Sequence, residues 1–286
     1  MHTIPVHYTP LQAATVRSRS PSAGKPPLVV ADWRARGLPL HIVEPAPVSV
    51  EELCLAHDRA YVEDVLACRR ANGFGTTDPG VAASLPYTTG SLLSAARDAR
   101  ANGRVACSPT SGFHHARHAS GGGFCTFNGL VVTACVLLRE GARSVGILDC
   151  DEHYGDGTEE ILGRLGGRAI RHITAAADWR RPSQAADFLR ALPERVAEMD
   201  GCDVLLYQAG ADPHIDDPLG GWLTDAQLRE RDRIVFTTAR ERGIPVAWTL
   251  AGGYQQDADG GIDPVLAIHR ATMEACVEVY LRASPA

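Results

Sequence analysis

The chain has 286 residues, of which 45% are hydrophobic and 22% charged, the balance of a soluble globular protein. Its 28 basic and 34 acidic residues give a formal net charge of -6, which argues against direct nucleic-acid binding and against attachment to an anionic membrane. No run reaches the roughly 18 apolar residues of a membrane span. The amino-terminal "MHTIPVHYTPLQ" lacks both parts of a secretory signal, so we expect a cytoplasmic protein.

One domain over residues 1–286 is the simplest organisation, because no repeat or low-complexity tract divides the chain. The Pro-, Ser- and Gly-rich residues 17–27 are typical of a loop. The eight cysteines are scattered and include no CxxC pair, in a chain too long to need a disulfide framework. We therefore expect reduced and mostly buried thiols.

Short apolar or β-branched runs alternate along the chain with helix-like segments. The runs predict strands at residues 4–8, 40–44, 104–108, 144–149, 169–174, 203–209 and 245–251. The clearest predicted helices are residues 50–71, 128–142, 184–199 and 224–243. In the last of these, Thr224 and Gln227 match the capping pattern of a helix start, and Gly243 matches the glycine that commonly ends a helix. Strands alternating with helices favour a mostly parallel sheet that is covered on both faces.

Four predicted strands end in polar clusters. They are followed by His114 and His115, by Asp149 to Asp156, by Asp212, and by Tyr254. Each cluster alone has an ordinary explanation, as surface histidines, as Asp in turns or as a loop tyrosine. Because the carboxyl ends of parallel strands share one edge of a sheet, we expect the four clusters to form one site.

The stretch "ILDCDEHYGDG" (147–157) places polar side chains on alternate residues. In an extended segment Asp149, Asp151 and His153 point to one side. Asp and His at this spacing can share a metal ion, and a further carboxylate such as Asp212 leaves a coordination position open. Zinc is favoured, while ferrous iron, manganese and cobalt also suit this donor set. Such an ion suits the hydrolysis of an amide or ester.

These motifs, in this order, resemble the histone deacetylase family and its relatives, the acetylpolyamine amidohydrolases and acetoin-utilisation proteins. The matching segments are "GFHHARHASGGGFCTFNGL" (112–130), "ILDCDEHYGDGTEE" (147–160), "QAGADPHIDDPLGGWLT" (208–224) and "LAGGYQQD" (250–257), with a weaker echo in "LCLAHDRAYVEDVL" (53–66). The resemblance implies the arginase-like α/β fold: three α/β/α layers around a central, mostly parallel sheet of about eight strands.

The resemblance also implies a role for each matching residue. The ligands of the catalytic zinc would be Asp151, His153 and Asp212. His115, backed by Asp156, would be the general base and acid, and His114, backed by Asp149, its electrostatic partner. Tyr254 would polarise the scissile carbonyl.

Further residues match the substrate channel and a structural ion of that family. The channel residues would be Gly123, Phe124 and Leu219, with Cys125 near the floor. A structural potassium or sodium ion would bind the backbone carbonyls of Asp149, Asp151 and His153, together with the Thr174 hydroxyl. Gly155 and Gly157 are expected to give the chain the freedom to turn after the ligands.

The chain departs from the family pattern at three places. In the tyrosine loop Ala251 stands where glycine or glutamate is common, and we expect little effect. Tyr154 stands where a second histidine usually follows the ligand histidine. The segment after Thr174 is shorter than usual and lacks the loop that carries the second aromatic wall of the channel. Either Trp179 replaces this wall, or the site is wider than in a typical deacetylase.

The leading hypothesis is therefore a metal-dependent deacylase acting on acylated lysine or a similar small amine. An acetylated polyamine or a small acylated metabolite is the alternative substrate, and Asp216 and Asp217 offer acidic groups to a polyamine cation. A two-manganese hydrolase of the arginase type would need a second ligand set, and only one Asp-x-His set is present. From another class, an inactive metal-binding module that recognises acylated partners would share the ligands. The oligomeric state is not predicted.

Overall fold

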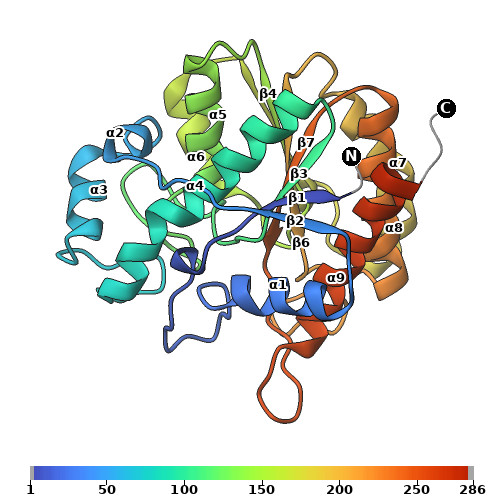
Figure 1. Cartoon of the computed structure of the whole chain (residues 1–286), viewed down its shortest axis with the longest axis horizontal. Helices are drawn as coiled ribbons and strands as arrows, with labels where there is room; N and C mark the ends of the chain where they lie inside the picture. Colours follow the sequence, from blue (N-terminus) through green and yellow to red (C-terminus); the bar gives the residue numbers. More distant parts are fainter. Residues whose placement is uncertain (1–2, 283–286) are drawn as a thin grey trace.

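A sheet of seven parallel strands forms the centre of the molecule in the computed structural model, which describes residues 3–282 (Figure 1). The strand order across the sheet is β2-β1-β3-β7-β6-β4-β5. The strands are β1 (Ile4–His7), β2 (Leu40–Val43), β3 (Val105–Ser108), β4 (Val145–Asp149), β5 (Ile170–Thr174), β6 (Val204–Gly210) and β7 (Val246–Ala251). All seven predicted strands are present, and every pairing between them is parallel. The seven strands described are close to the expected number of about eight.

Helices cover both faces of the sheet and complete the three predicted layers (Figure 1). The first layer contains α2 (Val50–Leu53), α3 (Arg59–Leu66), α4 (Pro79–Asn102), α5 (Gly129–Arg139) and α6 (Asp156–Leu165). The second contains α1 (Lys25–Ala35), α7 (Ala185–Ala197), α8 (Asp225–Glu241) and α9 (Asp263–Val277). Short helical turns are η1 (Pro10–Gln12), η2 (Ala175–Ala177), η3 (Pro182–Gln184) and η4 (Glu278–Arg282). Among the described helices, none combines the length and apolar character needed to cross a membrane.

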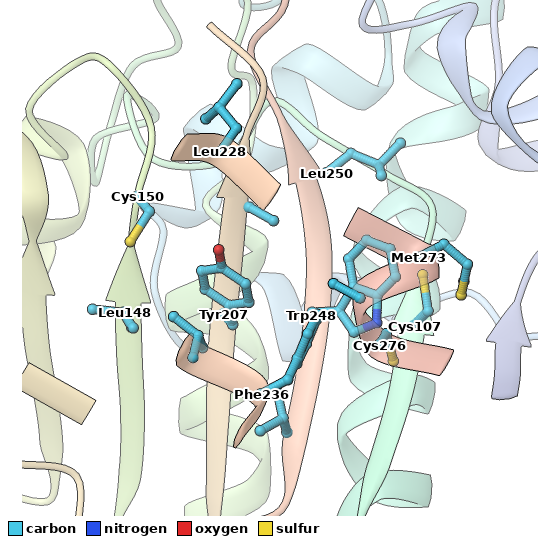
Figure 2. Packing of buried hydrophobic residues seen from close by; sticks show 14 of the residues in the cluster. Cys107, Leu148, Cys150, Tyr207, Leu228, Phe236, Trp248, Leu250, Met273 and Cys276 are labelled. Carbon is cyan, nitrogen blue, oxygen red and sulfur yellow. The ribbon is translucent and has the colours of Figure 1, made fainter. Parts of the chain in front are cut away.

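The strands bury side chains on both faces, as parallel strands between two helical layers must. Tyr207 of β6 and Trp248 of β7 point to the face covered by α8, where both rings contact Phe236 (Figure 2). The neighbouring residues Leu206 and Ala247 point to the opposite face and join the second core cluster. This alternation explains why the strands appear in the sequence as continuous apolar runs.

Two local predictions differ from the structure. The predicted helix 50–71 is divided into α2 and α3, because the Asp58 side chain accepts a hydrogen bond from the backbone N–H of Tyr61 and starts a new helix. The predicted loop 17–27 ends earlier than expected, since α1 begins at Lys25. Pro26 is compatible with this position, because the first turn of a helix leaves backbone N–H groups without helical partners.

The ends of α8 agree with the sequence pattern. The Thr224 side chain accepts from the backbone N–H of Gln227, and the Gln227 side chain accepts from that of Thr224. Gly243, just beyond the helix, has a left-handed φ of 67°. All eight cysteines are free, and five of them are buried, which confirms the expectation of thiols.

Candidate active site

The four polar clusters predicted from the sequence meet at the carboxyl edge of the sheet. Strands β3, β7, β6 and β4 are neighbours in this order, so their carboxyl ends lie side by side. Asp149 at the end of β4 pairs in register with Gln208 of β6, and Gln208 pairs with Thr249 of β7. The convergence expected of a parallel sheet is therefore present.

Asp151, His153 and Asp212 form one cluster, in which their metal-capable atoms all lie within 4.8 Å of one another. The Nδ1 atom of His153 is 3.2 Å from Asp151 Oδ1 and 3.1 Å from Asp212 Oδ2. Residues 151–153 form a bend and do not continue β4. Two Asp side chains shape this bend: Asp149 Oδ1 accepts from the N–H of Asp151, and Asp151 Oδ1 accepts from the N–H of His153.

The donors of this cluster fit a divalent transition-metal ion. Two carboxylates and one imidazole supply three protein ligands and leave further positions open. Burial and the neighbouring Asp151 raise the pKa of Asp212 to about 7, because two buried carboxylates in one site repel each other. A cation bound between the two carboxylates removes this repulsion.

His114 is buried and paired with Asp149. Its Nδ1 atom lies 2.7 Å from Asp149 Oδ2, and its Nε2 atom lies 3.6 Å from Asp151 Oδ1. The other oxygen of Asp149 accepts a hydrogen bond from Gln208 Nε2 at 2.8 Å. Burial alone would lower the pKa of His114, but the carboxylates of Asp149 and Asp151 outweigh it and raise this pKa to about 9. In the metal-free protein these carboxylates therefore favour the charged form of His114.

His115 is paired with Asp156 and has the opposite shift. Its Nδ1 atom lies 2.6 Å from Asp156 Oδ1, and Arg117 Nη2 donates to the other oxygen of Asp156 at 2.5 Å. Its ring centroid is 4.0 Å from that of His114 and 5.8 Å from that of His153. Burial and the nearby charge of His114 lower the pKa of His115. Of the two adjacent histidines, one is thus held charged and the other neutral.

Tyr254 lies on a loop that passes directly over a ligand of the cluster. Gly252 and Gly253 have left-handed φ angles of 45° and 90°. A Cβ atom at Gly252 would lie 2.1 Å from Asp212 Cγ, so only glycine allows this approach. The backbone N–H of Tyr254 donates to Asp217 Oδ2 at 2.8 Å. Burial and the Asp212 carboxylate raise the pKa of the Tyr254 hydroxyl, which therefore keeps its proton.

Lys25, the only lysine in the chain, is fully buried and bonded to the same loop. Its Nζ atom donates to the carbonyl of Gly252 and lies 3.4 Å from His269 Nε2 of α9. Burial lowers the pKa of Lys25 to about 8, an effect that Asp212 and other nearby carboxylates partly oppose. A buried amine thus ties the start of α1 to the loop that carries Tyr254.

Phe124 and Gly123 lie beside the histidine pair and the tyrosine. The ring centroid of Phe124 is 5.8 Å from that of Tyr254 and 6.0 Å from that of Phe74. Phe124 has a left-handed φ of 63°, which is unusual for a bulky residue and is typical of functional sites. A Cβ atom at Gly123 would lie 2.5 Å from His115 Cδ2, so this glycine lets the loop lie flat against the imidazole.

Trp179 is partly buried and packs against the core, which gives no support to the idea that it replaces the second channel wall. Its ring centroid is 5.3 Å from that of Phe188, and the Arg195 guanidinium lies over the ring at 5.4 Å from the centroid. Leu219 and Tyr154 are both partly open to solvent, with exposed fractions of 47% and 36%. The second expectation, a wider approach to the site, stays a prediction.

Cys125 and Thr174 lie at the edges of the site. Cys125 is buried, its Sγ is 3.4 Å from the Gly123 carbonyl oxygen, and burial raises the pKa of the thiol. Thr174 ends β5 opposite Asp149, and its hydroxyl accepts from the N–H of Gly155 at 3.4 Å. This hydroxyl is close to the backbone predicted to hold a monovalent cation, and that assignment stays a prediction.

Gly155 and Gly157 have a different purpose from the one predicted. Gly155 has a φ of -73°, and Gly157 lies within α6 without a left-handed φ, so neither supplies unusual turning freedom. Both allow close packing instead. A Cβ atom at Gly157 would lie 2.5 Å from the carbonyl carbon of His115, and one at Gly155 would lie 2.9 Å from Asp149 Oδ2.

Several residues that hold the site together were not predicted as such. They are Lys25, Arg117, Gln208 and Asp217. The composition of the sequence does single out Lys25, because it is the only lysine among the 28 basic residues. Asp217 was considered as an acidic group at the mouth, but it is buried. No sequence pattern indicates that Gln208 or Asp217 turns toward a catalytic group.

The fold and the ligand cluster together define the class, a parallel α/β protein with a candidate metal centre at the carboxyl edge of its sheet. Comparison with known families is more specific. Residues 25–165 and 163–262 match the histone deacetylase domain, and the chain belongs to this family.

Individual relatives and solved structures agree with this assignment. Histone deacetylase 2 of Arabidopsis thaliana is 31% identical over 170 residues, which cover 51% of this chain and 43% of that protein. The chain spans less than two thirds of the length of this and other curated relatives that it matches. The crystal structure of the HDA15 HD domain has a TM-score of 0.77 at 18% identity and covers 99% of this chain and 91% of its own. The acetylpolyamine aminohydrolase from Burkholderia pseudomallei has a TM-score of 0.72 at 17% identity and covers 97% of this chain and 99% of its own. Both structures share the fold.

Proposed function

We propose that the protein is a metal-dependent deacylase that hydrolyses the acyl-amide of an acylated lysine or a similar amine. The observation that carries the proposal is the pair of adjacent histidines, His114 and His115, whose pKa values are moved in opposite directions beside a metal-ligand cluster. Opposed shifts of this kind are what acid–base chemistry at neutral pH requires. A module that only binds a metal ion has no need of them.

In this proposal the ligand cluster holds the metal ion and His115 moves the proton. Asp151, His153 and Asp212 would hold a divalent ion, with zinc favoured and ferrous iron an alternative, which would supply Lewis acidity and lower the pKa of a water molecule. Because Nδ1 of His115 is directed at Asp156, its Nε2 atom is the one free to accept a proton from the attacking water. The same atom then returns the proton to the nitrogen of the leaving amine.

The oxygen of the scissile carbonyl is stabilised by two further groups. The Tyr254 hydroxyl donates a hydrogen bond to this oxygen as negative charge develops on it. The positive charge of His114 favours the same charge build-up from a buried position. Asp217 supports this arrangement by accepting a hydrogen bond from the backbone N–H of Tyr254, which fixes the backbone that carries the tyrosine side chain.

The surroundings favour an acylated lysine over an acetylated polyamine as the substrate. Phe124 and Phe74 offer an aromatic surface to an alkyl chain. Asp217, which was one of two acidic groups expected at the mouth, is buried and accepts the N–H groups of Leu219 and Tyr254. Only Asp216 of that pair remains exposed to a cationic substrate.

The test is a deacylation assay on purified, zinc-loaded protein with acyl-lysine peptides, acylpolyamines and small acylated amides. We expect His115→Ala to lower kcat by about 10²- to 10⁴-fold and Tyr254→Phe by about 10²- to 10³-fold. His41→Ala is the matched control and should leave kcat unchanged, because the His41 side chain is exposed on the edge strand β2. If the zinc-loaded protein releases no acyl group from any substrate class, the enzyme hypothesis is withdrawn and a binding module becomes the better account.

A further inference from the structure

A fully buried ion pair, Arg231 and Asp232 of α8, lies below the strand ends that lead to the metal ligands. The two side chains have exposed fractions of 0% and 1%. Burial opposes the charge of Arg231, but Asp232 together with Tyr207 and Cys150 outweighs this effect, so the pKa of the guanidinium is raised. Removing such a pair from water costs several kcal/mol per ion, and well-packed apolar residues are often as stabilising. Stability alone therefore gives no reason for this pair.

The contacts of Arg231 indicate another purpose. Its Nη1 atom donates to the carbonyl of Gly210 at 2.7 Å and to the carbonyl of Cys150 at 3.2 Å. Gly210 ends β6 two residues before Asp212, and Cys150 directly precedes Asp151. One guanidinium group thus bridges the two chain segments that lead to two of the three predicted ligands.

The bridge lies where the pairing of β4 with β6 ends. The register of these strands ends at Asp149 and Gln208, followed by a hydrogen bond from Cys150 N–H to the Gln208 carbonyl. Beyond this point the segments are in close contact, since a Cβ atom at Gly210 would lie 2.6 Å from Asp151 Cα. Arg231 therefore continues the connection between the strands at the position where their ladder stops.

Asp232 holds the guanidinium in place and is itself bonded to residues on two other elements. Its Oδ1 atom accepts from Arg231 Nε at 2.8 Å and from the Tyr207 hydroxyl of β6. Its Oδ2 atom accepts from Thr272 Oγ1 of α9 at 2.6 Å. Figure 2 shows the Tyr207 hydroxyl pointing toward the same end of the sheet as Cys150. The arginine is thus anchored to β6, α8 and α9, so its position is fixed before any ligand binds.

We propose that Arg231 is a positioning residue that sets the spacing between Asp151 and Asp212 and thereby the metal affinity of the site. The inference rests on the proposed function only in requiring that these two carboxylates bind a divalent ion. Outer groups that orient metal ligands typically contribute about 10- to 100-fold to metal affinity.

The test measures the zinc affinity of metal-free protein by competition with a chromophoric chelator. The main variant is Arg231→Met combined with Asp232→Leu, which replaces both charges by apolar groups and leaves no buried charge unpaired. Arg231→Lys keeps the charge but places all of its donors on one nitrogen, so it lacks the rigid fork with which arginine bonds Asp232 and the two carbonyls from different atoms. Phe236→Leu is the matched control, because Phe236 is equally buried on α8 and contacts the ring of Tyr207 but neither carbonyl.

We expect the double variant to bind zinc about 10- to 100-fold more weakly than wild type, Arg231→Lys to be intermediate, and Phe236→Leu to match wild type. Circular dichroism and thermal unfolding show which variants are folded, and if the double variant is not, Arg231→Lys decides. Folded variants that bind zinc within about twofold of wild type overturn the inference, and so does an equal loss in Phe236→Leu. A wild-type protein that binds zinc but releases no acyl group refutes the proposed function and leaves the positioning role standing.

Discussion

Lys25 allows a direct test of the electrostatics around the candidate site, because no other lysine can contribute to the signal. Burial lowers its pKa from 10.5 to about 8 in the folded protein. Each pKa unit corresponds to about 1.4 kcal/mol, so a shift of this size is linked to about 3 kcal/mol of unfolding free energy. Because the folded pKa is the lower one, this contribution is fully present above the unfolded pKa and is lost as the pH falls through the folded pKa. Relative to Lys25→Met, wild type should therefore gain up to about 3 kcal/mol between pH 8 and 10.5.

Two measurements check this prediction on metal-free protein. Protein labelled with ¹³C only in lysine gives one ε-carbon NMR signal, and its pH dependence reports the folded pKa directly. Urea unfolding of wild type and Lys25→Met at several pH values then measures the linked free energy, because effects of cysteine and tyrosine ionisation cancel in the difference. Lys25→Arg is the control, since its charge does not titrate in this range. A signal that titrates near the ordinary lysine pKa, with no pH-dependent difference in stability, would show that Lys25 is solvated and that its placement in the core is wrong.

Two further predictions concern residues around the substrate approach. Asp217→Ala removes the acceptor for the N–H groups of Tyr254 and Leu219, and each of these hydrogen bonds contributes about 1 kcal/mol. We therefore expect kcat to fall about 10-fold, while the zinc affinity measured by chelator competition stays unchanged. An unaltered kcat would contradict the support role of Asp217. Trp179→Ala removes a ring packed on Phe188 and should lower the unfolding free energy in urea by about 3 kcal/mol without changing KM; a raised KM at unchanged stability would place Trp179 in the substrate channel.

The strands were predictable because their signals are local and strong. Five of the seven strands, β1, β3, β4, β6 and β7, are buried along their whole length, so their hydrophobic residues are continuous and easily recognised. The edge strands β2 and β5 are only partly buried. The helix α4 was not predicted, although it is the longest helix described. Its sequence contains Pro86 in the interior and many Gly, Ser and Thr residues, which weaken a helical pattern. The Asp78 cap and tertiary packing on α5 and β3 decide the conformation instead.

The site was predictable in its composition and only partly in its geometry. Asp149, Asp151 and His153 were expected on one side of an extended segment. The strand in fact ends at Asp149, whose carboxylate pairs with His114, while the bend that follows directs Asp151 and His153 to the metal-ligand cluster. The alternate spacing placed the right residues together for a reason other than strand geometry. Side chains that accept hydrogen bonds from nearby backbone N–H groups produce such bends. Whether a bend forms at a given place also depends on contacts with residues that are distant in sequence.

The different charge states of the two histidines show most clearly how the fold determines chemistry. His114 and His115 are adjacent and each is paired with a carboxylate at nearly the same distance, 2.7 and 2.6 Å, so pairing alone cannot move their pKa values in opposite directions. The difference lies in the other charges near each ring. His114 is close to Asp151 and Asp212 as well as to Asp149, and these carboxylates together outweigh its burial and raise its pKa. For His115, burial and the charge of His114 outweigh the effect of Asp156, so its pKa is lowered. The fold thus favours a charged and a neutral imidazole at adjacent positions, because it gathers several carboxylates around the first ring and places the second beside the first.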